Sequence, residues 1–255
     1  MFFALEFPSI GHLVDWEGLL FKDSLIEVNK TVMLMFLALA IVLALFIVAA
    51  KRGELVPRGV QNVVEAGVDF VRTDVIQQTI GQDGMRFLPF LVTMFFFIFV
   101  TNIFEVIPGI QFPVNARMAL PAFLALLVWA MYNYIGIRTS GFFGYLKSIT
   151  IPPGVPKALL VLVAPIEFIS TIFVRPFSLA VRLFANMLAG HLLLVTFAVL
   201  SAAVFSKTLL IIMLPLTFGM LTALTGFEVL VAVLQAFIFT ILTAVYIAGA
   251  MHPEH

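Results

Sequence analysis

Charged and amide side chains interrupt two long apolar segments in the C-terminal half of the chain, over residues 158–200 and 209–250. An ionisable group at membrane depth costs about 3 kcal/mol or more, so such residues mark functional sites by default. The chemistry open to these residue types is the holding and relaying of protons inside a bilayer. The first segment carries Glu167, Arg175, Arg182, Asn186 and His191, and the second carries Glu228, Gln235 and Tyr246.

Arg182 lies midway along the first segment, too far from either end for its side chain to reach the membrane surface. A guanidinium keeps its proton at any accessible pH, so it needs a carboxylate or water nearby. No residue within one helical turn is acidic, so the counter-charge must come from elsewhere in the chain or from another subunit. Because Ser178, Ala185 and Ala189 share its helix face, another helix can approach closely there. We find no purely structural role for this arginine.

His191 lies nine positions beyond Arg182, which is half a helical revolution and about 13 Å along the axis. The two residues are therefore expected to serve different sites. Glu228, Gln235 and Tyr246 are separated by seven and eleven residues, so they return to nearly the same azimuth on a helix. The resulting polar stripe could line a water-filled path.

Structural alternatives are open for the polar residues other than Arg182. Arg175 with Pro176 is also typical of a helix kink whose cation extends to the cytoplasmic interface. Glu167, closer to that interface, is either a solvated surface acid or a channel entrance. The alternatives for the others are polar contacts between helices for Asn186, Gln235 and Tyr246, and a buried structural pair for His191 with Glu228.

The composition excludes most other classes of protein. Of the 255 residues, 62% are hydrophobic and 11% charged, whereas about a quarter of a soluble domain is charged. Fourteen basic residues balance 14 acidic ones, so nucleic acid binding is not expected. The absence of cysteine and the presence of only four histidines disfavour disulfides, a cysteine nucleophile and a metal site. No cofactor is expected. A mean hydropathy of +1.15 without barrel-type alternation predicts an all-α polytopic membrane protein.

The apolar segments predict about five membrane crossings in a single membrane domain over residues 1–255. A span needs about 20 apolar residues. The last two segments are too long to stand upright, so we expect a long antiparallel hairpin whose helices are strongly tilted or broken in the middle. The expected parts are an outer N-terminal segment over 1–30, spans over 31–50, 87–108 and 119–136, a cytoplasmic segment over 51–86 and the hairpin over 158–250.

Basic residues set the expected orientation. Lys51 and Arg52 directly follow the first span, and the positive-inside rule places them in the cytoplasm and the N-terminus outside. Within 51–86, valines recur at helical spacing opposite a polar face, which predicts an amphipathic helix at the membrane interface. A loop beginning at Arg138 is expected inside, a short loop with Lys207 outside, and the C-terminus in the cytoplasm. Because no secretory signal is evident, we expect the N-terminal segment to be retained.

Three stretches of the sequence resemble one known family. They read RPFSLAVRLFANMLAGH over 175–191, LQAFIFTILTAVYIAGAM over 234–251 and NIFEVIPG over 102–109. With the order and lengths of the segments, these motifs resemble subunit a of F-type ATP synthases over most of the chain. The resemblance is weakest over the first 30 residues and over 138–156.

The resemblance implies a non-catalytic, proton-translocating stator subunit of a rotary complex. In this family the arginine that corresponds to Arg182 faces a ring of c subunits. The membrane-embedded carboxylates of that ring supply the missing counter-charge. Two offset half-channels deliver protons to the ring and collect them from it, and the arginine separates the channels, so that proton flow turns the ring.

The same resemblance implies partners and a location. The partners are the c-subunit ring, b-type peripheral stalk subunits, the rest of the F1Fo complex and the lipid bilayer, and the location is a bacterial plasma (inner) membrane. ATP chemistry then lies on other subunits. The ion is expected to be H+, because Na+ needs suitable oxygen ligands, chiefly on the ring.

Carried over by position, the resemblance assigns polar residues to the two half-channels. The best-known bacterial pattern has Glu and His where this chain has His191 and Glu228, so the acid and the imidazole have changed places. The outer half-channel takes His191, Glu228, Asn186, Gln235, Asn102 and Glu105, and the inner half-channel takes Glu167 and Tyr246.

Other function classes are open on the residue types alone. A self-contained proton-coupled transporter would also carry intramembrane Arg, Glu and His, and it would have an internal substrate pocket and act when purified alone. A scaffold without transport would leave the cost of Arg182 unexplained. An enzyme has little support, because the sequence has no phosphate-binding loop, no paired catalytic carboxylates and no metal cluster.

Overall fold

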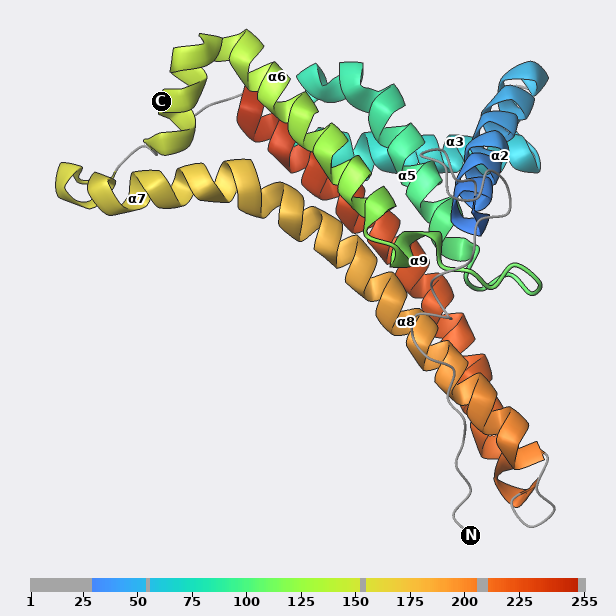
Figure 1. The fold of residues 1–255 in the computed structure, drawn as a ribbon. Helices are drawn as coiled ribbons and strands as arrows, with labels where there is room; N and C mark the ends of the chain where they lie inside the picture. The colour runs from blue at the N-terminus through green and yellow to red at the C-terminus, as the bar shows by residue number, and fades with distance from the viewer. Residues whose placement is uncertain (1–28, 54–55, 152–154, 206–210, 252–255) are drawn as a thin grey trace. The chain divides into compact units, whose positions relative to one another are not determined.

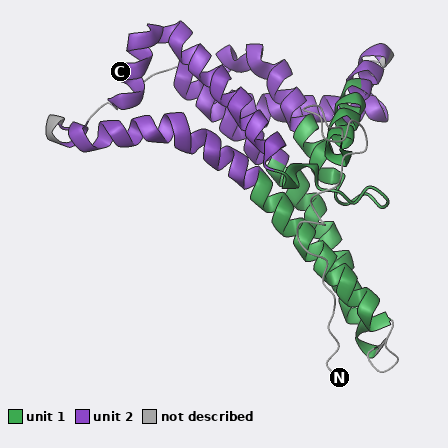
Figure 2. Cartoon of the chain, in the orientation of Figure 1, with its two compact units in different colours: residues 1–43, 97–117, 184–235 green, residues 44–96, 118–183, 236–255 purple. Residues whose placement is uncertain are grey.

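The computed structural model describes residues 29–53, 56–151, 155–205 and 211–251, which are helices and turns. The N-terminal segment up to residue 28 and the predicted outer loop with Lys207 lie outside the described residues. The chain divides into two compact units (Figure 2). Unit 1 comprises residues 1–43, 97–117 and 184–235, and unit 2 comprises residues 44–96, 118–183 and 236–255.

Among the described residues, five helical segments are long and apolar enough to cross a membrane. This confirms the predicted all-α polytopic fold, and the chain is a multi-pass integral membrane protein. The helices that form these segments are α2 (Lys30–Arg52), α5 (Leu88–Ile103), α6 (Ala119–Thr150), α7 (Lys157–Ile169) together with α8 (Arg175–Phe205), and α9 (Leu214–Met251) (Figure 1).

In unit 1 the second half of α8 and the first part of α9 lie side by side as antiparallel helices (Figure 1). The approach is close because α8 has a glycine at the contact: a Cβ added at Gly190 would come within 2.6 Å of the Glu228 carboxylate on α9. The last two long helices are thus in contact, as predicted. The segment after α5 belongs to the same unit, and Nζ of Lys30 lies 3.5 Å from its Ile110 carbonyl oxygen.

Unit 2 contains the predicted amphipathic helix. Val64, Val71 and Val75 are buried, as the spacing of the valines predicts, whereas Val63 is 61% exposed and Gln61 of the predicted polar face is buried. The ring of Phe70 packs against Phe95 of α5 and Phe237 of α9, with ring centres 5.7 and 5.4 Å away. The helix consists of α3 (Val60–Phe70), a π-helical stretch (Val71–Ile76) and α4 (Gln77–Thr79), and a 3-10 helix (Gln82–Phe87) leads on into α5.

The second spanning helix ends earlier than the sequence predicts. α5 stops at Ile103, whereas the apolar run continues to Pro108. The chain tightens into turns there: the Glu105 N–H donates to the Asn102 carbonyl at 3.2 Å, and Gly109 has a φ of 91°. Proline and a left-handed glycine cannot continue a helix, so Glu105 lies in a turn just beyond the span.

The third spanning helix continues where the sequence predicts a loop. α6 reaches Thr150 with a bend at Gly141, whose φ of 72° and ψ of 163° are readily adopted by glycine alone. Beyond the bend, the ring of Tyr145 covers Gly136, and its hydroxyl donates to Oδ1 of Asn133 at 3.1 Å. These contacts between residues on either side of the bend explain why the chain stays helical here.

The first half of the predicted hairpin is interrupted rather than uniform. A π-helical stretch, Ser170–Val174, joins α7 to α8, and the Arg175 N–H bonds to the Ser170 carbonyl, five residues back instead of four. Pro176 follows directly and has no N–H to donate. The second half, α9, is a single helix over Leu214–Met251.

Candidate functional site

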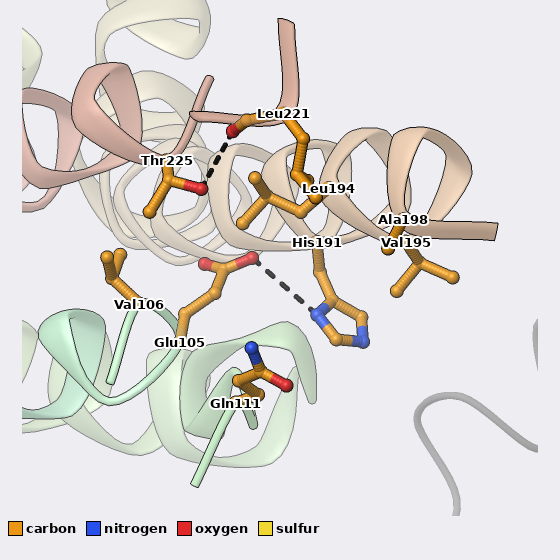
Figure 3. A pocket seen from close by; sticks show the side chains of 9 residues that line it. All are labelled: Glu105, Val106, Gln111, His191, Leu194, Val195, Ala198, Leu221 and Thr225. Carbon is orange, nitrogen blue, oxygen red and sulfur yellow. Dashed lines mark hydrogen bonds and ion pairs between the residues drawn. The ribbon is translucent and has the colours of Figure 1, made fainter. Parts of the chain in front are cut away.

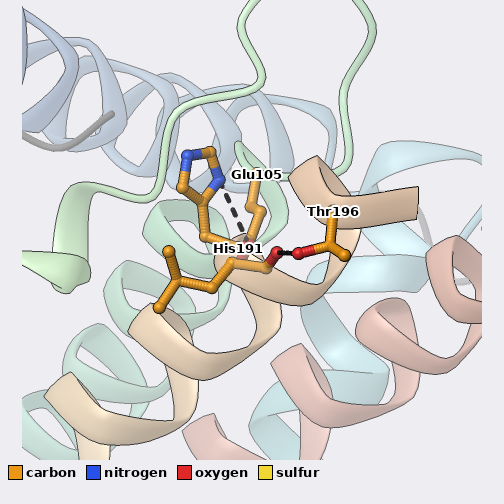
Figure 4. A network of polar contacts seen from close by, with 4 residues as sticks. Glu105, His191 and Thr196 are labelled. Carbon is orange, nitrogen blue, oxygen red and sulfur yellow. Dashed lines mark hydrogen bonds and ion pairs between the residues drawn. The ribbon is translucent and has the colours of Figure 1, made fainter. Parts of the chain in front are cut away.

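The side chains of Glu105 and His191 face each other in unit 1 (Figure 4). Glu105 comes from the turn after α5 and His191 from α8, and only 3% and 7% of them are exposed. Nδ1 of His191 lies 3.7 Å from Oε1 of Glu105, which is within ion-pair range but too long for a hydrogen bond. A small movement or a bridging water therefore suffices to pass a proton between them.

Glu228 of α9 completes a group that we call the Glu–His cluster (Glu105, His191 and Glu228). Its carboxylate lies over Gly190, the residue before His191, and only 4% of Glu228 is exposed. Burial and, second, the charge of Glu228 raise the pKa of Glu105 to about 8. Glu105 thus holds a proton at neutral pH. Among the described residues, no three His, Asp or Glu side chains are placed to hold a metal ion.

A small pocket opens beside the Glu–His cluster (Figure 3). Its volume is about 190 Å³, and its polar lining comes from Glu105, Gln111, His191 and Thr225. This is room for several waters, since one water occupies about 30 Å³ in the liquid. Both carboxylate oxygens of Glu105 are buried without a hydrogen-bond partner among the described residues. Because buried polar atoms are normally satisfied, the pocket is suited to hold water against Glu105.

A second buried polar group in unit 1 is formed by residues on either side of Glu105 in the chain. Nδ2 of Asn115 donates to Oγ1 of Thr101 at 2.9 Å and to Oδ1 of Asn102 at 2.6 Å, and all three residues are at most 1% exposed. Sequence reasoning identified Asn102 but missed the other two. Thr101 could have been identified from the sequence, because it stands beside an asparagine in an apolar span. Nothing in the local sequence distinguishes Asn115 from an ordinary turn asparagine.

Asn186 and Gln235 join α8 to α9 in unit 1. Nδ2 of Asn186 donates to Oε1 of Gln235 at 2.7 Å, and only 2% of Gln235 is exposed. Nε2 of Gln235 is buried without a partner among the described residues, so the pair retains a free donor. The bond fits a polar contact between helices. This N–H group of Gln235 is available to donate a hydrogen bond to water.

Arg182 is exposed, and the described part of the chain offers it no acidic partner within ion-pair distance. Ala185 and Ala189, which share its helix face, are exposed as well, and Ser178 is half-buried. A permanent cation therefore stands on an uncovered surface of small side chains within a spanning helix. Burying such a charge without a partner is costly, so this face calls for an anion that the described residues do not supply.

The residues predicted for the inner half-channel lie in unit 2, Glu167 on α7 and Tyr246 on α9. The ring of Tyr246 lies 5.8 Å from the ring of Tyr132, and the Arg175 guanidinium lies 5.5 Å from the centre of the Tyr246 ring. Glu167 is half-buried and has no charged partner among the described residues. Arg175, for which a kink and an interfacial cation were the structural alternative, thus also packs on an aromatic face.

Comparison with known proteins gives matches over most of the chain. The family described as ATP synthase A chain matches residues 32–248. Curated relatives named ATP synthase subunit a include a protein of Rhodococcus erythropolis, 45% identical over 172 residues, which are 67% of this chain and 62% of the relative. A protein of that name from Frankia alni is 43% identical over 171 residues, which are 67% of this chain and 59% of the relative.

A third relative with the same name, from a Nocardioides species, is 42% identical over 193 residues, which are 76% of this chain and 70% of the relative. The match to the first two relatives spans about three fifths of their length, at 62% and 59%. The family match over residues 32–248 includes the Glu–His cluster, Arg182, Asn186 and Gln235.

Proposed function

The chain belongs to the ATP synthase A chain family, and from this premise we propose that it is the proton-translocating stator subunit of a rotary F-type ATP synthase. It has no catalytic site of its own, and ATP chemistry belongs to other subunits of the complex. Its partners are a ring of c subunits bearing membrane-embedded carboxylates and a peripheral stalk of b-type subunits. The N-terminus lies outside a bacterial plasma membrane and the C-terminus in the cytoplasm.

The observation that carries this proposal is the exposed face around Arg182. A fixed guanidinium favours the ionised form of any carboxyl group that approaches it, and so releases the proton of each ring carboxyl that arrives. Its charge also repels hydronium, which keeps protons from passing directly between the two sides. The exposed alanines Ala185 and Ala189 leave room for the ring helix to come close.

The Glu–His cluster serves as the proton-handling part of the outer half-channel in this proposal. The pocket of about 190 Å³ beside it supplies room for water, and Glu105 holds a proton at neutral pH. Protons then pass through the cluster toward Asn186 and Gln235, whose hydrogen-bonded amides lie between α8 and α9. The exchanged positions of His191 and Glu228 keep one acid and one imidazole in the path.

The inner half-channel is assigned to Glu167 and Tyr246. Glu167 is half-buried and has no charged partner in the described residues. Its carboxyl group is therefore available to contact water. Tyr246 shares its helix with the outer residue Gln235, eleven positions earlier and at nearly the same azimuth. Arg182 separates the two paths, so a proton crosses the membrane only while bound to a carboxyl group of the ring.

The proposal is tested by ATP-driven acidification of inverted membrane vesicles that carry the complex with Arg182→Ala. Pumping should fall to background while the c ring still co-purifies with the chain. Arg138→Ala is the matched control, because Arg138 is also exposed and, among the described residues, donates to the Tyr134 hydroxyl. That variant should pump normally. Normal pumping by Arg182→Ala would contradict the proposal and favour a transporter that acts without a ring.

A further inference from the structure

The π-helical stretch Ser170–Val174 leaves one carbonyl without a backbone donor. In this register the carbonyl of residue i bonds to the N–H of residue i+5, as the Arg175 N–H does to Ser170. The next carbonyl along, that of Thr171, would need the N–H of residue 176. That residue is Pro176, which has none. Thr171 is only 3% exposed, so water cannot readily take the place of the missing donor.

Tyr132 of α6 supplies the missing donor. Its hydroxyl donates to the Thr171 carbonyl oxygen at 2.6 Å, and only 2% of Tyr132 is exposed. In an ordinary α-helix the Thr171 carbonyl would bond to the Arg175 N–H instead. The α register would in turn leave the Ile172 carbonyl without a donor, because its partner four residues on is Pro176. The phenol therefore gives the π register one more satisfied carbonyl than the α register, and its loss removes this difference.

The register of Ser170–Val174 sets the direction in which the side chains of α7 point relative to those of α8. A π turn holds one residue more than an α turn, so conversion to the α register would rotate α7 by about 100° relative to α8. Glu167 lies before the stretch and Arg182 after it, both in unit 2. The same phenol packs on the Tyr246 ring at 5.8 Å, so it contacts both elements that carry the inner residues.

We infer that Tyr132 is a positioning residue for the inner half-channel: its hydroxyl holds Ser170–Val174 in the π register and thereby fixes where Glu167 points relative to Arg182. This inference rests on the proposed function for its consequence in proton transfer. The register itself does not depend on that function. The two parts can therefore be tested separately.

The register is tested by the distance between two spin labels on the full-length chain in lipid nanodiscs. The chain has no cysteine, so Phe123→Cys on α6 and Ile166→Cys on α7 give two labels without background. Both positions are exposed, at 61% and 56%. Adding Tyr132→Phe should shift the distance by several ångströms. Tyr134→Phe is the control, because that phenol is 60% exposed, and it should leave the distance unchanged.

The consequence is tested by the rate of ATP-driven pumping in inverted vesicles against the pH of the bath, which contacts the cytoplasmic side. Tyr132→Phe should shift the bath pH for half-maximal rate, and Tyr134→Phe should not. A general loss of folding would lower the rate at every pH without this shift. An unchanged label distance would overturn the register claim, and a changed distance with an unchanged pH profile would overturn the positioning role. Normal pumping by Arg182→Ala would instead refute the proposed function alone.

Discussion

Glu105 is a single buried carboxyl group whose surroundings change its affinity for a proton. It is 3% exposed, its oxygens lack hydrogen bonds within the described residues, and the carboxyl group of Glu228 lies near enough to act on it by charge. Both burial and the like charge favour the neutral form. At a pKa of about 8 the group releases a proton under a small change of its surroundings, such as protonation or movement of His191.

This shift makes stability depend on pH in a defined direction. The pKa of Glu105 is about 8 in the folded chain against 4.5 without the fold, so the folded state binds the proton more tightly. Its contribution to stability is complete below about pH 4.5 and is lost as the pH rises toward 8. The thermal midpoint of the purified chain in detergent should therefore fall over this range, and Glu105→Gln should flatten that fall.

The control for this prediction is Asp83→Asn, since Asp83 is an exposed acid of unit 2. That variant should keep the pH dependence of the parent chain. An equal fall of the midpoint in Glu105→Gln and in the parent would contradict the burial of an ionisable carboxyl group at this position.

The pairing of α8 with α9 depends on small side chains at particular points. Gly190 allows the Glu228 carboxylate to lie directly against the α8 backbone, beside His191. Any Cβ at this position would meet both carboxylate oxygens at 2.6 Å. Because Gly190 has no side chain, Glu228 of the Glu–His cluster can take this position between the two helices.

Gly190→Ala should displace the Glu228 carboxylate and slow pumping about tenfold or more, since misplacing a reacting group by about 1 Å can cost a hundredfold. ATP-driven acidification of inverted vesicles measures this, with co-purification of the ring to show assembly. Gly226→Ala is the matched control, because a Cβ there meets nothing within 4 Å and the glycine lies on the same helix as Glu228. Equal rates in the two variants would show that the position of Glu228 does not limit transport.

At the scale of elements, the sequence predicts those features that depend on local hydropathy. The apolar runs identify the spanning helices, and the spacing of the valines identifies the amphipathic helix at α3. The continuation of α6 past Gly141 depends on Tyr145 packing over Gly136, a contact made only once the chain bends. The π-helical stretch before Pro176 likewise needs the hydroxyl of Tyr132 from another helix.

At the scale of the whole molecule, the candidate site also depends on contacts between residues that are far apart in the sequence. Intramembrane charge identifies Arg182, His191 and Glu228 from the sequence alone, because each is costly in lipid. His191, however, lies 3.7 Å from Glu105, an acid that comes from a turn 86 positions earlier. Asn115, which bonds to Asn102, is also brought in by the tertiary fold rather than by a motif. The spacing of residues along one helix cannot predict such tertiary contacts.

The account as a whole depends on what covers the face of Arg182. Among the described residues no acid pairs with this guanidinium, and the neighbouring Ala185 and Ala189 are exposed. A stator requires that a ring helix with a carboxyl group pass over this face. A transporter acting alone requires lipid there instead. The identity of the molecule next to Ala185 therefore distinguishes the two.

The most direct measurement is photo-crosslinking from Ala185→Cys in the intact complex, with a maleimide-linked benzophenone and mass identification of the adducts. The chain has no native cysteine, so the label is confined to that position. Phe36→Cys on α2, at a position 59% exposed, is the control. The account predicts c-subunit adducts from position 185 and lipid adducts from position 36. Lipid adducts alone from position 185, in a complex that retains its ring, would contradict it.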